Sequence, residues 1–208
     1  MELGPHEDRP GPEPDTGFPR RPKQGTIYQA MKIETALAAA VIMCAAIACT
    51  SAKKDERPPL RVVPFVDLQR YQGDWYEIAR YPNRFQKGCV GSRASYTLKD
   101  DGTVGVLNQC FEGSFGGKLR SAKGRARVVD KETNAKLKVT FFWPFRGDYW
   151  IIGLGRDYEY AVVGHPERRY LWILSRTKKM DEGIYEAILG RLEEEGYDTT
   201  RLIKTEQE

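Results

Sequence analysis

The stretch Gly73-Asp74-Trp75-Tyr76-Glu77-Ile78-Ala79-Arg80 decides the fold. A flexible glycine is followed by a large aromatic residue and then by residues that favour a strand. This arrangement predicts the first strand of a small closed β-barrel, with the indole of Trp75 covering its floor. The face of that indole can bind a cation from another strand, and the candidate is Arg176, which ends the stretch 171–176.

Strand-forming runs and turn residues alternate through the rest of the chain. The expected strands cover about 75–81 with a continuation to 98, then 103–111, 123–129, 136–143, 149–154, 160–164 and 170–175, with a last short strand at 202–203. A turn is expected at 144–148. This cadence predicts an all-β meander of antiparallel strands, and closure into a barrel removes its edge strands.

One helix is expected after the last long strand. Asp181 can cap its start and Gly196 can end it. Its apolar face is formed at helical spacing by Ile184, Ile188, Leu189 and Leu192. In so small a domain this face needs burial, so we expect one C-terminal α-helix packed outside the barrel rather than an independent interaction helix.

Three short motifs, in order, resemble the signature regions of the lipocalin family. They are Gly73-x-Trp75, then Arg156-Asp157-Tyr158, and finally Arg176. The phrases WYEIARY (75–81) and YLWILSRT (170–177) are similar to the bacterial outer-membrane lipoprotein lipocalins, and the resemblance runs from about Val66 to the end. It implies an eight-stranded up-and-down barrel built around a ligand cavity. Arg156 stands where the family usually has Thr, a change that concerns the closed end of the barrel.

The residues before the barrel predict a disposable leader. Residues 1–30 are polar and rich in proline, which predicts a disordered extension. Residues 31–48 combine a basic start with an apolar run too short to cross a bilayer, as in a signal peptide. Because such signals act at the N-terminus, we expect Met31 to be the true start and residues 1–30 to be an over-extended gene start.

Cys49 follows this signal directly, as in a bacterial lipoprotein, where it would be the lipidated first residue of the mature chain. A plain secretory signal or a short membrane anchor is the alternative. By the same resemblance, the non-acidic Thr50 implies export to the outer membrane, facing the periplasm. Residues 49–64 then form a tether to the lipocalin domain, 65–208.

Charge and cysteine content narrow the functional classes. The chain has 208 residues and a formal net charge of +4, with basic residues spread among acidic ones, so we expect no nucleic-acid binding.

Once Cys44 leaves with the signal and Cys49 carries lipid, Cys89 and Cys110 remain. They lie on either side of the turn at 100–102, which predicts a disulfide across a hairpin; two separate thiols are the alternative.

Alternation along the strands, aided by the resemblance, predicts a ligand-binding lumen. The residues expected to face it are Tyr96, Asn108, Phe141, Trp143, Tyr149, Ile151, Trp172 and Leu174. Each of these can also be plain core filling. Arg93, Arg125 and Tyr149 are candidates for contacting a charged head group near the mouth. This lining suits a long acyl chain better than a charged metabolite.

The sequence therefore predicts a membrane-anchored lipocalin that binds, stores or transports a hydrophobic ligand such as a fatty acid or lysophospholipid. By resemblance, its role would be membrane lipid maintenance under stress. We expect no enzymatic activity, no metal and no cofactor, because His165 is the only histidine after the leader. The alternatives are an isomerising lipocalin that uses a cavity thiol and a structural lipoprotein with a filled barrel. Whether the protein is a homodimer stays open.

Overall fold

The computed structural model describes residues 57–208. These residues belong to one compact unit, Asp55–Glu208. The expected extension, signal peptide and Cys49 lie outside the described residues, as does the first part of the expected tether.

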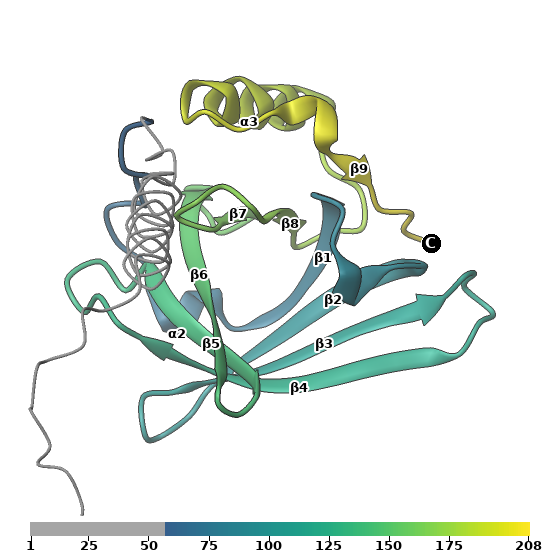
Figure 1. Ribbon diagram of the computed structural model, residues 1–208, viewed down its shortest axis with the longest axis horizontal. Helices are drawn as coiled ribbons and strands as arrows, with labels where there is room; N and C mark the ends of the chain where they lie inside the picture. Colours follow the sequence, from purple (N-terminus) through teal and green to yellow (C-terminus); the bar gives the residue numbers. More distant parts are fainter. Residues whose placement is uncertain (1–56) are drawn as a thin grey trace, which may run out of the picture. The chain divides into compact units, whose positions relative to one another are not determined.

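Nine strands and two α-helices make up this unit (Figure 1). The strands are β1 (Gly73–Arg80), β2 (Cys89–Leu98), β3 (Val104–Glu112), β4 (Leu119–Val128), β5 (Lys136–Phe142), β6 (Phe145–Leu154), β7 (Tyr160–Gly164), β8 (Leu171–Ser175) and β9 (Ile203–Lys204). The helices are α2 (Leu68–Tyr71) and α3 (Glu182–Glu194), and short 3-10 turns occupy Arg84–Gln86 and Thr199–Arg201.

Strands β1 to β8 form a closed antiparallel barrel with up-and-down connections. Each strand pairs with the next, and β1 pairs with both β2 and β8, for example Trp75 with Ala94 and Tyr76 with Ser175. The predicted fold class is therefore confirmed.

Two strands begin earlier than the sequence predicted. β4 starts at Leu119 rather than 123, and β6 starts at Phe145 rather than 149. The residues gained are mostly polar or small, so they lack the apolar alternation of a strand. They are held by pairing with a neighbour, Leu119 with Phe111 and Gly147 with Val139. The last short strand lies one residue later than expected, at β9.

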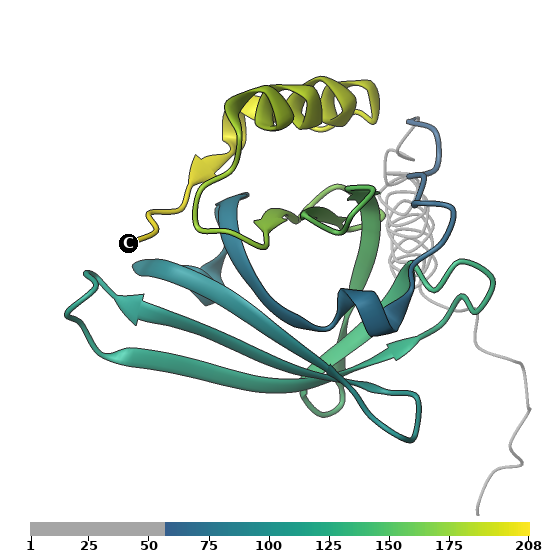
Figure 2. The ribbon, with the colours of Figure 1, turned by 180° about the vertical axis from the view of Figure 1, so that it is seen from behind.

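The connections between strands define two ends of the barrel. We call the end carrying α2 and the β2–β3, β4–β5 and β6–β7 connections the closed end (Figure 2). The open end carries the β1–β2, β3–β4, β5–β6 and β7–β8 connections. An antiparallel meander places alternate connections at opposite ends, so this division follows from the topology.

Helix α3 packs outside the barrel, as predicted. The Asp181 side chain accepts a hydrogen bond from the Ile184 backbone N–H at 3.0 Å, and Gly196 ends the helix with φ +80°. Its buried residues Tyr185, Ile188 and Leu192 join a cluster with outward-facing barrel residues, including Ile173 and Val162. A separate cluster around Trp75 fills the closed half of the barrel.

The chain reaches α2 along the outside of the barrel. The Pro58 carbonyl accepts a hydrogen bond from Arg168 in the β7–β8 turn at 2.8 Å. Farther along, Val63 N–H donates to the Ile151 carbonyl and Val66 N–H to the Thr133 carbonyl of the β4–β5 connection. Residues 57–66 thus run from the open end to the closed end, and the last part of the expected 49–64 tether is packed on the barrel.

The predicted disulfide joins Cys89 at the start of β2 to Cys110 near the end of β3. The two Cα atoms are 5.5 Å apart. This bond ties the β2–β3 hairpin together at the open end, where β2 is no longer paired with β1.

Candidate functional site

The floor of the barrel is built from Trp75 and the residues around it. Gly73 has φ +91°, a conformation that favours glycine, and it lets the chain turn from α2 into β1. Trp75 is fully buried, and its indole N–H donates to the Tyr71 carbonyl at 2.9 Å. The Arg176 guanidinium lies 3.9 Å from the indole centroid, which confirms the predicted cation–π contact.

The three signature motifs meet at this closed end. Arg176 donates to the carbonyls of Asp74 and Arg70 at 3.0 and 2.7 Å and to that of Tyr158 at 3.3 Å. The Tyr158 hydroxyl accepts from the Asp67 backbone N–H at 2.8 Å. Asp157 lies on the surface, 3.9 Å from Arg70. These contacts fix α2 over the floor, which is the structural role of the motifs.

Three tyrosines, the buried Tyr71 and Tyr96 and the partly buried Tyr149, form a hydrogen-bonded cluster above the floor. The Tyr149 hydroxyl donates to the Tyr96 hydroxyl at 2.9 Å and lies 2.8 Å from the Tyr71 hydroxyl. A phenol has one proton to donate, so Tyr71 is the donor to Tyr149. Burial raises the pKa of Tyr96 to about 12 and raises the pKa values of Tyr71 and Tyr149 well above their usual range. Sequence reasoning missed Tyr71, although an aromatic residue two positions before Gly73 is a signal for it.

This cluster gives a pH prediction. The folded protein retains the Tyr96 proton up to about pH 12, whereas an unperturbed tyrosine loses it near 10.0. The protonated Tyr96 therefore makes its full contribution to the free energy of unfolding below pH 10. As the pH rises from there to about 12, this contribution is lost at up to about 1.4 kcal/mol per pH unit. We expect wild-type protein to lose stability faster over this range than Tyr96→Phe, measured by urea unfolding at each pH. Parallel losses in the two proteins would contradict the assignment.

The residues expected to line the lumen fall into three groups. Tyr96, Tyr149, Ile151 and Leu174 belong to the closed half, where they pack with the core around Trp75. Phe141 and Trp172 are partly buried against the edge of that core. Asn108 is exposed, although its pairing with Ala94 places it on the same face as Trp75. Trp143 differs from the expectation, because it lies at the β5–β6 tip and is 83% exposed.

The open half of the lumen has small side chains at inward positions. Ala122 pairs with Asn108, Gly124 with the core residue Val106, and Gly147 with Val139. Ala122, Asn108 and Gly147 are exposed even though they share the inward face of the strands. Both faces of β4 from Ser121 to Lys123 are thus accessible. These inward positions are therefore accessible to solvent at the open end of the barrel, where β4 extends past its last pair with β5, Arg125 with Thr140.

Two of the residues predicted to contact a ligand head group, Arg93 and Arg125, point away from the lumen. Arg93 and Arg125 each alternate with inward residues, and both are more than two fifths exposed. Arg93 lies 3.7 Å from Asp74, and Arg125 lies 3.7 Å from Asp101. Both therefore face outward, and the prediction for them is wrong. Because side chains alternate with a period of two along a strand, an error of one residue in the expected register moves a residue to the opposite face.

A cation that sequence reasoning missed lies at the open end. Arg120 is paired with Cys110 and is partly buried. Its guanidinium donates to the carbonyls of Lys87 and Phe85 in the β1–β2 loop at 3.2 and 3.3 Å. Arg120 thus holds this loop at the mouth of the lumen.

A buried ion pair closes the wall at the same end. Glu77 and Arg80 are 3% and 6% exposed, and Arg80 Nη1 lies 3.0 Å from Glu77 Oε1. The Thr205 hydroxyl donates to Glu77 and accepts from Arg80. Gln86 also donates to Glu77, and the indole N–H of Trp172 donates to Gln86 at 2.9 Å. A buried pair of this kind needs such additional hydrogen bonds.

The C-terminal segment supplies part of that network. Strand β9 pairs with Ala79 and Arg80, beyond the point where β1 and β2 stop pairing. The Gln207 side chain donates to the carbonyls of Glu77 in β1 and Ser92 in β2 at 2.8 and 2.9 Å. Residues 203–207 therefore bridge the gap between the two strands.

Comparison with known proteins agrees with this architecture. Residues 66–207 match the family model of the lipocalin-like domain. The chain is 44% identical to temperature-induced lipocalin-1 of Arabidopsis thaliana, covering 73% of this chain and 85% of the relative. It is 38% identical to the outer membrane lipoprotein Blc of Escherichia coli, covering 85% and 98%.

More distant relatives share the fold. Apolipoprotein D of Macaca fascicularis is 34% identical over 68% of this chain and 77% of its own. The solved structure of insecticyanin from Manduca sexta superposes with a TM-score of 0.60 at 20% identity, covering 73% of this chain and 86% of that one. Given the closed barrel, the three motifs at its floor and these relatives, the chain belongs to the lipocalin family.

Proposed function

We propose that this lipocalin carries one single-chain lipid, a fatty acid or a lysophospholipid, in the open half of its barrel. The observation that carries the proposal is the set of exposed inward positions around Ala122 and Asn108. Homologous lipocalins support the binding of a hydrophobic ligand in general. The floor around Trp75 and the tyrosine cluster limits how deeply the ligand enters.

Apolar burial supplies the binding energy in this proposal. Each methylene transferred from water contributes about 0.8 kcal/mol, offset by the cost of ordering the chain. Phe141, Val139 and Trp172 are partly buried against the core and offer apolar contacts in the open half of the barrel. An acyl chain can cover this apolar lining, whereas a compact charged metabolite would leave most of its apolar surface without a contact.

We infer that the protein acts by binding rather than by catalysis. An isomerising lipocalin of the kind considered above needs a free thiol in the cavity. Both cysteines of the described barrel, Cys89 and Cys110, are joined to each other. A disulfide sulfur is not a thiolate nucleophile, which argues against that alternative.

The proposed location is the bacterial outer membrane, through lipidated Cys49 and facing the periplasm. Support comes from relatives that are named outer membrane lipoproteins in Escherichia coli and Vibrio cholerae. Within residues 57–208 no helix has the length and apolar character needed to span a bilayer. A role in membrane lipid maintenance under stress follows from this location and is part of the proposal.

Native mass spectrometry tests the proposal. The protein is expressed in a periplasm, purified, weighed under native and denaturing conditions, and extracted for lipid. We expect a fatty acid or lysophospholipid at close to one per protein. An empty protein whose tryptophan fluorescence is not quenched on lipid titration would contradict the proposal and favour a structural lipoprotein.

A further inference from the structure

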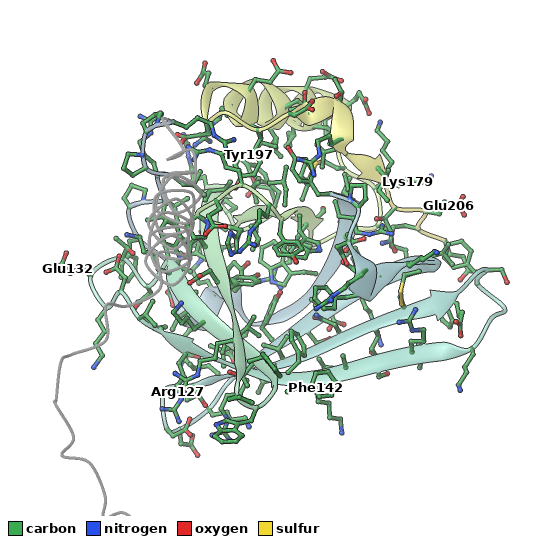
Figure 3. The ribbon with its side chains drawn as sticks, viewed as in Figure 1. Arg127, Glu132, Phe142, Lys179, Tyr197 and Glu206 are labelled. Atoms are coloured by element: carbon green, nitrogen blue, oxygen red, sulfur yellow. A yellow bond between two sulfur atoms is a disulfide. The ribbon has the colours of Figure 1, made fainter. Side chains whose placement is uncertain are left out.

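The tip of the β5–β6 hairpin exposes three large aromatic side chains. Phe142, Trp143 and Phe145 are 77%, 83% and 78% exposed, and they are separated only by Pro144. Figure 3 shows Phe142 on the side of the barrel away from α3. Isolated apolar residues on a surface are ordinary, but three in four consecutive positions form a contiguous patch that points to an interaction.

This hairpin projects beyond β7, its neighbour on one side, at the open end, whereas β4 on its other side continues past Arg125, the partner of Thr140, to Leu119. Trp150 in β6 pairs with Gly164, the last residue of β7, so β6 continues for five further residues to Phe145. The β1–β2 loop at the same end adds Phe85, which is 58% exposed. The exposed aromatic tip is therefore free, on its β7 side, to contact a surface that approaches the mouth of the barrel.

The strand connections at the two ends of the barrel differ in charge. The open-end connections (81–88, 113–118, 143–144 and 165–170) carry five cations and one acid, a net charge of +4: Arg84, Lys87, Lys118, Arg168 and Arg169 against Glu167. The closed-end connections (99–103, 129–135 and 155–159) carry three cations and six acids, a net charge of −3: Lys99, Lys131 and Arg156 against Asp100, Asp101, Asp130, Glu132, Asp157 and Glu159. The exposed Arg146 beside the aromatic tip adds to the positive end.

The N-terminal segment also starts at this end. Arg57 donates to the Gly196 carbonyl at 2.9 Å, and Pro58 is bonded to Arg168 in the β7–β8 turn. Only seven residues, 50–56, lie between Cys49 and Arg57, so eight Cα–Cα steps join the two. Even when fully extended they span at most roughly 28 Å. A lipid anchor at Cys49 would thus hold the open end, rather than the closed end, near the bilayer.

We propose that the open end docks on an anionic lipid bilayer, with Phe142, Trp143 and Phe145 entering the interface and the surrounding cations facing lipid phosphates. Aromatic side chains favour the boundary between headgroups and acyl chains, and basic residues are attracted to anionic lipid. This inference rests on the proposed function, to which it adds an orientation: the mouth faces the membrane, so a single-chain lipid passes between bilayer and lumen over a short path.

A second copy of the chain is a poorer occupant for this surface. Two open ends facing each other bring together two sets of connections that each carry a net +4. Like charges at such an interface oppose association, whereas an anionic bilayer complements them.

Vesicle binding by residues 55–208, the compact unit that contains both cores, tests the inference without the lipid anchor. The probe is vesicles of phosphatidylethanolamine and phosphatidylglycerol, with phosphatidylcholine vesicles for comparison. Trp75 is buried and Trp150 and Trp172 are partly buried, so Trp143 is the tryptophan placed to respond. We expect a blue shift of its emission on anionic vesicles, weakened by salt.

Matched variants show whether the aromatic tip is responsible. Phe142→Ser/Trp143→Ser/Phe145→Ser is expected to reduce vesicle partitioning, measured by co-sedimentation, by at least about tenfold. The control Phe65→Ser/Val129→Ser removes exposed apolar side chains, 58% and 53% exposed, near the closed end and should leave partitioning unchanged. Equal partitioning of wild type and the triple variant, or a tip-dependent dimer without vesicles, would overturn the inference.

Binding of cis-parinaric acid, a fluorescent fatty acid, separates this inference from the proposed function. The triple variant should still bind the probe in vesicle-free solution, because its substitutions lie at the tip rather than in the lumen. Wild-type protein that binds the probe but not anionic vesicles would refute docking and leave the carrier function standing. Protein that binds vesicles but no probe would refute the carrier function instead.

Discussion

Replacing Arg80 by alanine is expected to lower the free energy of unfolding by about 3–5 kcal/mol, because it leaves a buried carboxylate without its cation. Glu77, 3% exposed, keeps only the neutral donors Thr205 and Gln86. The substitution also removes the bond from Arg80 to the Gln86 carbonyl in the β1–β2 loop. Urea unfolding followed by far-UV circular dichroism measures the effect.

The control is the same substitution at an exposed pair. Arg169 lies 2.8 Å from Glu167, and both side chains are 63% exposed. Arg169→Ala should cost less than about 1 kcal/mol, as solvent screens such pairs. Similar losses of unfolding free energy in the two variants would show that burial of the Glu77–Arg80 pair does not determine how much the pair contributes to stability.

Replacing Trp75 by alanine is expected to cost about 3–5 kcal/mol, because it leaves a cavity where a fully buried indole packs in the floor. Trp75 is fully buried, and the Arg176 guanidinium 3.9 Å from its ring would lose its cation–π partner. Urea unfolding is again the measurement. Trp143→Ala makes the same chemical change at an 83% exposed position and should alter stability by no more than about 0.5 kcal/mol. Equal effects of these two substitutions would contradict the assignment of Trp75 as the floor.

Local sequence signals were enough to predict the frame of the molecule. Gly73 and Trp75 mark the first strand. Gly73 supplies the positive φ and Trp75 the wide apolar side chain that are both needed where the chain enters the floor of the barrel. Asp181 and Gly196 mark α3 because capping chemistry acts within one helical turn. The disulfide followed from the symmetric spacing of Cys89 and Cys110 about one hairpin turn.

Features that depend on register could not be read from the sequence. A bulge between Glu77 and Ala79 changes which side chains of β1 face inward, and it brings Glu77 and Arg80 together. Their partner Thr205 is more than a hundred residues away in sequence, so no local pattern predicts it. The outward direction of Arg125 and the exposed position of Trp143 likewise depend on where each hairpin turns.

The most direct test of the central claim places a bulky side chain inside the open half of the barrel. Ala122 and Lys123 are adjacent and both exposed, but Ala122 shares the inward face with Asn108 and Lys123 faces outward. Ala122→Trp should weaken binding of cis-parinaric acid and oleoyl lysophosphatidylethanolamine by at least about tenfold, equivalent to about 1.4 kcal/mol. Lys123→Trp should change it by less than about twofold, since it fills no lumen space. Unchanged affinity in Ala122→Trp, or equal losses in both variants, would contradict a lipid site within the barrel.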